Sequence, residues 1–156
     1  MKPQETNDFK WVGTDLHVHT PASKDYKGRR DESEYVRLIQ SANQFHEVRK
    51  DRHSERNNER NPIGCIVFTD HNSVEGFVTY RTITEETDRL SKAIRNRDSD
   101  NPLAPILERD LETLRSVRIL MGVEIKANPG IHVLVVFAES VDADEVRSGN
   151  HMLCLF

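Results

Sequence analysis

A run of apolar residues at positions 63–69, Ile-Gly-Cys-Ile-Val-Phe-Thr, constrains the fold more than any other segment. It lacks polar alternation, which is typical of a parallel strand that helices cover. Apolar residues recur at helical spacing on both sides of it, within 35–45 and within 74–94. Strands that alternate with helices predict an α/β fold with a mainly parallel sheet.

The same patterns predict further strands and helices. Strands are expected at 11–18, 117–125 and 131–138. A helix with Asn101 as its cap and Pro102 at its first position should cover 103–114. The turn signal at 128–130 is short enough to join the last two strands as an antiparallel pair, and a short helix should start near Asp142.

Helix starts are also predicted from capping residues. Asp31 or Ser33 can cap the first helix, and Asp31 with Glu34 has the spacing of a capping box. Asn72 and Glu75 have the same spacing before the second helix.

Composition narrows the class of protein. The chain has 156 residues, enough for one domain with a real core. Its 22 basic and 26 acidic residues give a charge of −4, which argues against a general polyanion-binding protein. No apolar run approaches the roughly 20 residues that span a bilayer. The first ten residues lack the apolar core of a signal peptide, and Cys65 and Cys154 make no disulfide framework. We expect a cytoplasmic protein without a membrane partner.

Three parts of the chain are expected. Residues 1–10 are predicted to be a disordered lead-in, 11–147 an α/β domain and 148–156 a tail. Within the domain, the dense charges of 46–61 indicate a solvated helix extension or an inserted loop, and a nucleic-acid contact is the alternative.

Histidines and acids mark the end of the first predicted strand. Asp15, His17 and His19 alternate along it and therefore share one face. Two imidazoles on one side of a strand end can chelate one cation or two adjacent ones. Asp15 is placed to orient a ligand histidine. The alternative is a pair of incidental surface histidines.

The later strand ends carry the remaining candidates. Asp70 and His71 directly follow the apolar run, where Asp70 could also serve as a helix cap. Glu124 lies in an apolar strand and needs a partner, either a metal ion or an arginine. His132 is a ligand candidate or a hydrogen-bonded core histidine. Asp25 is a further candidate in a turn-like segment. Imidazole with carboxylate suits Zn, Mn or Fe rather than Ca.

Four pieces of the chain resemble the ordered motifs of the PHP family, which is named for its polymerase and histidinol-phosphatase members. They are Asp15-Leu-His-Val-His-Thr-Pro-Ala-Ser23, Phe68-Thr-Asp-His-Asn-Ser-Val-Glu-Gly76, Gly122-Val-Glu-Ile125 and Gly130-Ile-His-Val-Leu134. The resemblance spans about 11–137. It implies a distorted, TIM-like (β/α)7 barrel with two or three divalent transition metal ions (Mn, Zn or Fe). It also implies hydrolysis of phosphoesters, either small monoesters and nucleotides or nucleic-acid ends.

The resemblance also implies roles for single residues. By motif position, Glu124 is similar to a carboxylate that bridges two metals, and Asp25 lies near a third-metal ligand. The other implied metal ligands are His17, His19, His71 and His132. Asp15 and Asp70 are expected to orient ligand imidazoles. The stretch His-Thr-Pro-Ala-Ser is similar to the corresponding stretch of PHP domains at the N-terminus of large ATPase-coupled proteins. This similarity implies an ATPase-type partner.

The sequence departs from the family in its size. A full barrel needs roughly 200–250 residues, only about four strands are predicted, and no second Asp-x-His follows His132. We therefore expect the N-terminal half of a barrel, as a fragment, a truncated reading frame or a reduced variant. Exposed strand edges would favour a homo-oligomer or another partner.

Two other functions stay open. One is a non-catalytic, metal-binding or structural half-barrel that needs a partner or a missing C-terminal segment. The other is a metal-dependent amidohydrolase, for which Lys126 is the candidate strand-borne lysine. The substrate of a phosphoesterase could meet basic residues near the motifs, which are Lys24, Lys27, Arg29, Arg30 and Lys126.

Overall fold

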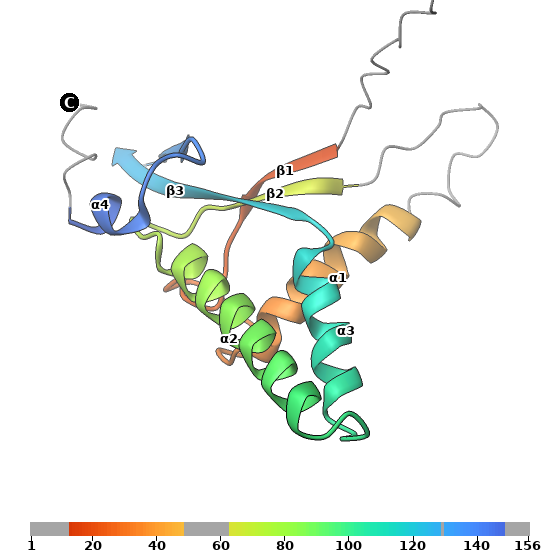
Figure 1. Cartoon of the computed structure of the whole chain (residues 1–156). Coiled ribbons are helices and arrows are strands. Elements are labelled where there is room, and N and C mark those ends of the chain that lie inside the picture. Colours follow the sequence, from red (N-terminus) through yellow and green to blue (C-terminus); the bar gives the residue numbers. More distant parts are fainter. Residues whose placement is uncertain (1–12, 49–62, 129, 149–156) are drawn as a thin grey trace, which may run out of the picture.

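The structure is a computed structural model, and it describes residues 13–48, 63–128 and 130–148. Within these ranges the chain is a mixed α/β fold (Figure 1). Its elements, in chain order, are β1 (Gly13–Val18), α1 (Ser33–Val48), β2 (Ile63–Phe68), α2 (Glu75–Arg97), α3 (Ala104–Arg115), β3 (Arg118–Asn128), β4 (Ile131–Val136) and α4 (Ala143–Arg147). The predicted lead-in, most of the charged segment 46–61 and residues 149–156 of the tail lie outside the described residues.

The four strands form one sheet in the order β1-β2-β3-β4. β1 pairs with β2 and β2 with β3 in parallel, and β3 pairs with β4 antiparallel. The mainly parallel sheet and its one antiparallel pair are therefore confirmed. Gly130 has a φ of 86° in the turn between β3 and β4, a conformation that glycine adopts without steric cost. The sheet is open and curled, which is compatible with part of a barrel.

The main core lies between the sheet and the helices α1, α2 and α3, which lie below the sheet in Figure 1. Phe68 of β2 is at its centre, with ring contacts to Tyr35 of α1 at 6.1 Å and Tyr80 of α2 at 5.7 Å between centroids. Leu114 of α3 is fully buried in the same cluster. In the described part of the chain, α1, α2 and α3 lie on one side of the sheet.

The capping box predicted for α1 is not formed. The Glu34 backbone N–H donates to the carbonyl oxygen of Asp31 at 3.1 Å. The Glu34 carboxylate is buried and accepts from the Tyr26 hydroxyl at 2.6 Å and from Arg37 Nε at 2.7 Å. The phenol of Tyr26 and the guanidinium of Arg37, one turn along the same helix, take the place of the Asp31 backbone N–H, because a buried carboxylate needs strong donors. This contact fixes the segment between β1 and α1.

The starts of the next helices also differ from expectation. Asn72 does not cap α2: it adopts a left-handed φ of 51°, and Ser73 Oγ accepts from the Glu75 N–H at 3.1 Å instead. α3 begins at Ala104, so Pro105 rather than Pro102 occupies its first turn. The helix expected near Asp142 is confirmed as α4.

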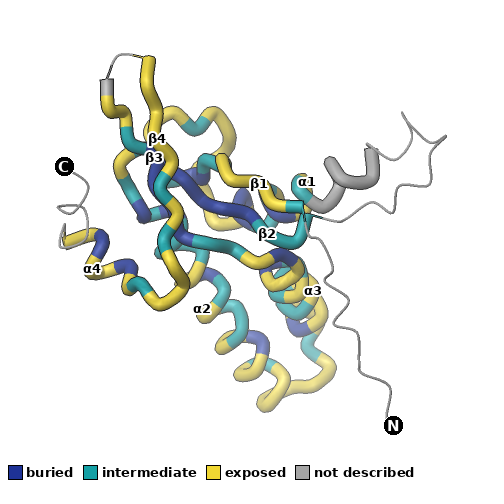
Figure 2. The backbone as a smooth tube through the Cα atoms, turned by 90° about the horizontal axis from the view of Figure 1, so that it is seen from above, coloured by how far each residue is buried: buried dark blue, intermediate teal, exposed yellow. Residues whose placement is uncertain are grey.

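α4 closes a second, smaller core. The Asp142 side chain accepts from the Asp144 N–H at 2.7 Å and so caps this helix. Ala143 and Val146 of α4 pack with Val74 and Met121. Figure 2 places α4 beside the start of α2 and away from α3. Among the described helices, none combines the length and apolar character needed to cross a membrane.

Candidate metal centre

The backbone brings the predicted site residues of all four strands to the same end of the sheet. Past the end of β2 the chain remains paired with β3, because the Glu124 N–H donates to the Asp70 carbonyl at 3.1 Å and the Asn72 N–H to the Glu124 carbonyl at 2.9 Å. This isolated parallel bridge sets His71 directly beside Glu124. The carboxyl ends of parallel strands meet at one edge of a sheet, which is where α/β proteins bind ligands.

Glu124 is the centre of the cluster. Its side chain is 1% exposed, and its Oε2 lies 2.9 Å from His17 Nε2, 2.7 Å from His19 Nε2 and 3.4 Å from His71 Nδ1. Its other oxygen, Oε1, contacts His132 Nδ1. The partners of this buried carboxylate are thus four histidines, and the arginine that the sequence left open is not among its described contacts.

The charge of Glu124 is stabilised by these contacts. Burial raises the pKa of a carboxyl group, but the hydrogen bonds from His17, His132 and His19 outweigh it, and the pKa of Glu124 falls to about 2. The carboxylate is therefore ionised at neutral pH. An ionised carboxylate surrounded by imidazole nitrogens could hold a metal ion.

Asp25 lies on the outer side of two of these histidines. Its Oδ1 is 3.1 Å from His19 Nδ1, and its Oδ2 is 3.1 Å from His71 Nε2. Ser23 Oγ donates to Asp25 Oδ1 at 2.6 Å. This hydrogen bond and the nearby His19 and His71 hold the pKa of Asp25 at about 2, in spite of a smaller opposing effect of desolvation. Asp25, which the sequence offered as a further candidate, belongs to the cluster.

Three overlapping groups of potential metal ligands result. They are His17 with His19 and Glu124, His19 with Asp25 and His71, and His71 with Glu124 and His132. The ligand atoms within each group lie within 4.8 Å of one another. Ligands at Zn–N distances of 2.0–2.1 Å in a tetrahedron are about 3.3 Å apart. In the first group, Glu124 Oε2 lies 2.9 Å from His17 Nε2 and 2.7 Å from His19 Nε2, and the two histidine nitrogens are 3.0 Å apart. These separations are somewhat below that spacing, so small shifts would let the three atoms surround one ion.

Asp70 bonds to backbone N–H groups and to a hydroxyl, not to an imidazole ring. It is buried and accepts from the Thr20 N–H at 2.7 Å, from Thr20 Oγ1 at 2.6 Å and from the Gly76 N–H. Burial raises the pKa of Asp70. No imidazole is among its described hydrogen-bond partners, so it fixes His19 through the backbone of the next residue.

Asp15 likewise contacts backbone. Its Oδ1 accepts from the N–H of His17 at 3.2 Å, and its side chain is exposed. The expectation that Asp15 orients an imidazole has no counterpart among the described hydrogen bonds. Thr20, Ser23 and Glu34 support the site without having been predicted. The sequence signal for the first two was their place in His-Thr-Pro-Ala-Ser, directly after the candidate ligand His19.

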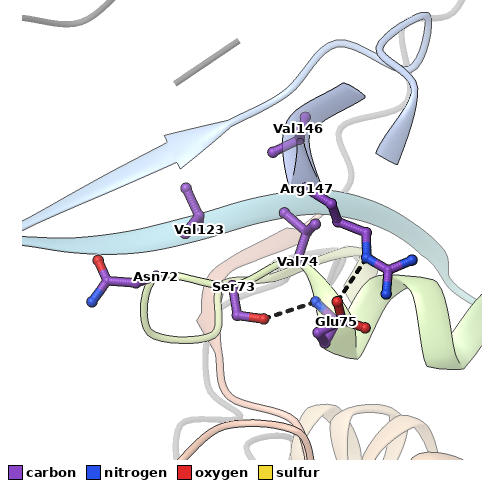
Figure 3. Close-up of a pocket in the computed structure, with 7 residues that line it drawn as sticks. All are labelled: Asn72, Ser73, Val74, Glu75, Val123, Val146 and Arg147. Atoms are coloured by element: carbon purple, nitrogen blue, oxygen red, sulfur yellow. Dashed lines mark hydrogen bonds and ion pairs between the residues drawn. The ribbon is translucent and has the colours of Figure 1, made fainter. Parts of the chain in front are cut away.

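A separate cavity of about 280 Å³ lies near the start of α2 (Figure 3). It is lined by Asn72, Ser73, Val74, Glu75, Val123, Val146 and Arg147. Glu75 and Arg147 form an ion pair at 2.7 Å in its wall. Successive residues of a strand point to opposite faces, so Val123 in the cavity and Glu124 in the cluster lie on opposite sides of β3. The cavity contains none of the potential metal ligands.

Comparisons with known proteins do not identify a relative. No protein-family model matches the chain. No curated protein and no solved structure matches it either.

Proposed function

We propose that this chain is a metal-dependent phosphoesterase whose ions are held by the cluster around Glu124. One observation supports this most directly: the two oxygens of Glu124 face different histidines. Oε2 lies next to His17 and His19, and Oε1 contacts His132. A carboxylate in this position can share two cations, an arrangement used for in-line phosphoryl displacement.

We further propose that two ions bind, not three. A neutral imidazole carries one N–H and offers only one lone pair to a metal. The group that contains Asp25 uses two histidines of the other groups. His19 also belongs to the group of His17, and His71 also belongs to the group of His132. All three groups therefore cannot be filled at once. The two groups that share only Glu124 can, because Glu124 has two oxygens.

We assign Asp25 to the ring nitrogens of His19 and His71 that point away from Glu124, called here the outer nitrogens. Histidines that bind a metal usually donate their other N–H to a carboxylate, which fixes the tautomer and the ring orientation. Asp25 is 3.1 Å from the outer nitrogens of both His19 and His71. We assign it this orienting role in place of the third-metal ligand that the PHP resemblance implied.

Divalent ions in this site would supply a hydroxide by lowering the pKa of water from 15.7 to about 7, and would neutralise phosphate oxygens. The residues of this chain provide the geometry. Glu124 holds the two positions close together and compensates part of the charge. His17 and His132 are 48% and 44% exposed, so a phosphate can approach the cluster from solvent.

The motif order that resembles the PHP family supports the same reaction, with the curled sheet as part of a barrel. The rival reading is a half-barrel that binds metal without turnover. Both functions predict bound metal, but only a phosphoesterase would also hydrolyse phosphoesters. The first measurement is therefore metal content per chain by plasma mass spectrometry on protein without a histidine tag, followed by hydrolysis of p-nitrophenyl phosphate with added Mn²⁺.

Variants make this test specific. Glu124→Gln should lose bound metal and activity while its far-UV circular dichroism spectrum stays unchanged. Glu139→Gln, which removes an exposed carboxylate paired with Arg118, is the matched control and should behave like wild type. Metal without hydrolysis of any tested phosphoester would favour the non-catalytic half-barrel. Full metal content in Glu124→Gln would refute the site itself.

A further inference from the structure

We propose that Lys126 binds the terminal phosphate of the substrate and thereby selects phosphate monoesters. This inference rests on the proposed function and names a substrate-binding residue for it. Lys126 is opposite His132 in the register of β3 and β4. It is also two residues from Glu124 on a regular part of β3. Both relationships put its side chain on the face of the metal cluster.

The local backbone sets Lys126 at the rim of this face. The regular β3–β4 pairing ends directly after it, with a shift in register between Lys126 and Asn128. Irregularities of this kind re-aim side chains and are frequent next to active sites. Lys126 is exposed, so its ammonium group can extend over the open side of the cluster.

No ion-pair partner of Lys126 is found among the side chains that the structure describes, which are those of residues 13–42, 63–127 and 130–148. Two of the other basic residues near the motifs have described partners of their own. Arg29 Nε lies 3.3 Å from Asp31 Oδ2, and Arg30 donates to the Lys24 carbonyl at 3.0 Å. An unpaired lysine beside a carboxylate-histidine cluster is available for an anionic ligand.

Charge indicates the kind of anion. Two divalent cations outweigh the two carboxylates Glu124 and Asp25, and Lys126 adds further positive charge. This excess favours a doubly charged terminal phosphate over a singly charged phosphodiester. The amidohydrolase alternative would instead use Lys126 at the metal ions. Glu124 already has its two oxygens in the bridging position, so Lys126 is left for the substrate.

The experiment measures binding of inorganic phosphate to the metal-loaded chain by calorimetry, with metal content determined on the same samples. Lys126→Gln should retain its metal and bind phosphate about 10- to 100-fold more weakly, as expected for loss of a charged hydrogen bond. Lys126→Arg should recover most of the affinity. Lys92→Gln is the matched control, because Lys92 pairs with Asp88 on α2, outside the cluster, and should bind phosphate like wild type.

A second readout concerns selectivity. Lys126→Gln should raise KM for p-nitrophenyl phosphate more than KM for bis-p-nitrophenyl phosphate. Wild-type phosphate affinity in Lys126→Gln, or no phosphate binding by the metal-loaded wild type, would overturn the inference and leave the metal site intact. Loss of metal in Lys126→Gln would overturn it in favour of a lysine ligand. A wild-type chain without metal would refute the proposed function and this inference together.

Discussion

Asp70 and Thr20 are joined by two hydrogen bonds, one from the Thr20 backbone N–H at 2.7 Å and one from its hydroxyl at 2.6 Å. The pair fills the space in front of Gly76. A β-carbon at position 76 would lie 2.1 Å from both Asp70 Oδ2 and Thr20 Oγ1. The residue after His19 is thus fixed by a contact that only glycine at position 76 permits.

Gly76→Ala is expected to destabilise the protein. Glycine to alanine inside a helix normally stabilises by up to about 1 kcal/mol. Here the added methyl group must displace a buried hydrogen-bonded pair, and overpacking of this kind costs about 1–3 kcal/mol. The free energy of unfolding from urea titration measures the difference. Thr82→Ala, at an exposed position of α2, is the control, and a more stable Gly76→Ala would contradict the packing described here.

His17→Ala and His132→Ala should each remove one metal ion and leave the other. The two histidines contact different oxygens of Glu124 and belong to groups that share only that residue. Both are largely exposed, so each variant should remain folded. Metal content per chain is the measurement. Loss of all metal in both variants would show that the two positions are not independent.

Asp25→Asn should keep two ions but bind them about 10- to 100-fold more weakly, the usual effect of removing a residue that orients a metal ligand. The reason is that Asp25 contacts the outer nitrogens of His19 and His71. Competition with a chelator of known affinity measures the change. If Asp25 were itself a ligand of a third ion, wild type would contain one more ion than the variant.

Acid should weaken the fold partly through Glu34. Hydrogen bonds from Arg37 and Tyr26 lower the pKa of Glu34 from 4.5 to about 2. Because the folded state favours the charged form, the contribution of Glu34 is present above pH 4.5 and is lost as the pH falls towards 2. Glu34→Gln should therefore be less stable than wild type at neutral pH, and the two should converge in acid.

The comparison needs urea titrations of metal-free protein near pH 7, about 5 and about 3. Glu112→Gln, which changes an exposed carboxylate of α3, is the control and should track wild type at every pH. A difference between wild type and Glu34→Gln that stays constant from neutral to acid pH would contradict the role assigned to the Glu34 charge.

Periodicity was sufficient to predict most of the fold. The apolar run 63–69 and the alternating helices predicted a mainly parallel sheet, which β1, β2 and β3 form, and the short turn at 128–130 allowed the antiparallel pair of β3 and β4. These features are local, because period and turn chemistry depend on residues close in sequence. The order of the strands was not predicted. Helix starts were predicted less well, since Glu34 and Asn72 take part in contacts that a local capping rule does not consider.

The sequence by itself determined which residues could ligate a metal. His17, His19, His71, Glu124 and His132 could be selected because histidines and acids at strand ends are unusual and the ends of parallel strands meet. Only the tertiary structure decided that Glu124 Oε2 faces His17 and His19 while Oε1 faces His132. It also decided that Asp25 contacts the outer nitrogens of His19 and His71 and that Asp70 is hydrogen-bonded to Thr20. Those choices depend on register and side-chain direction across strands distant in sequence, which no local pattern encodes.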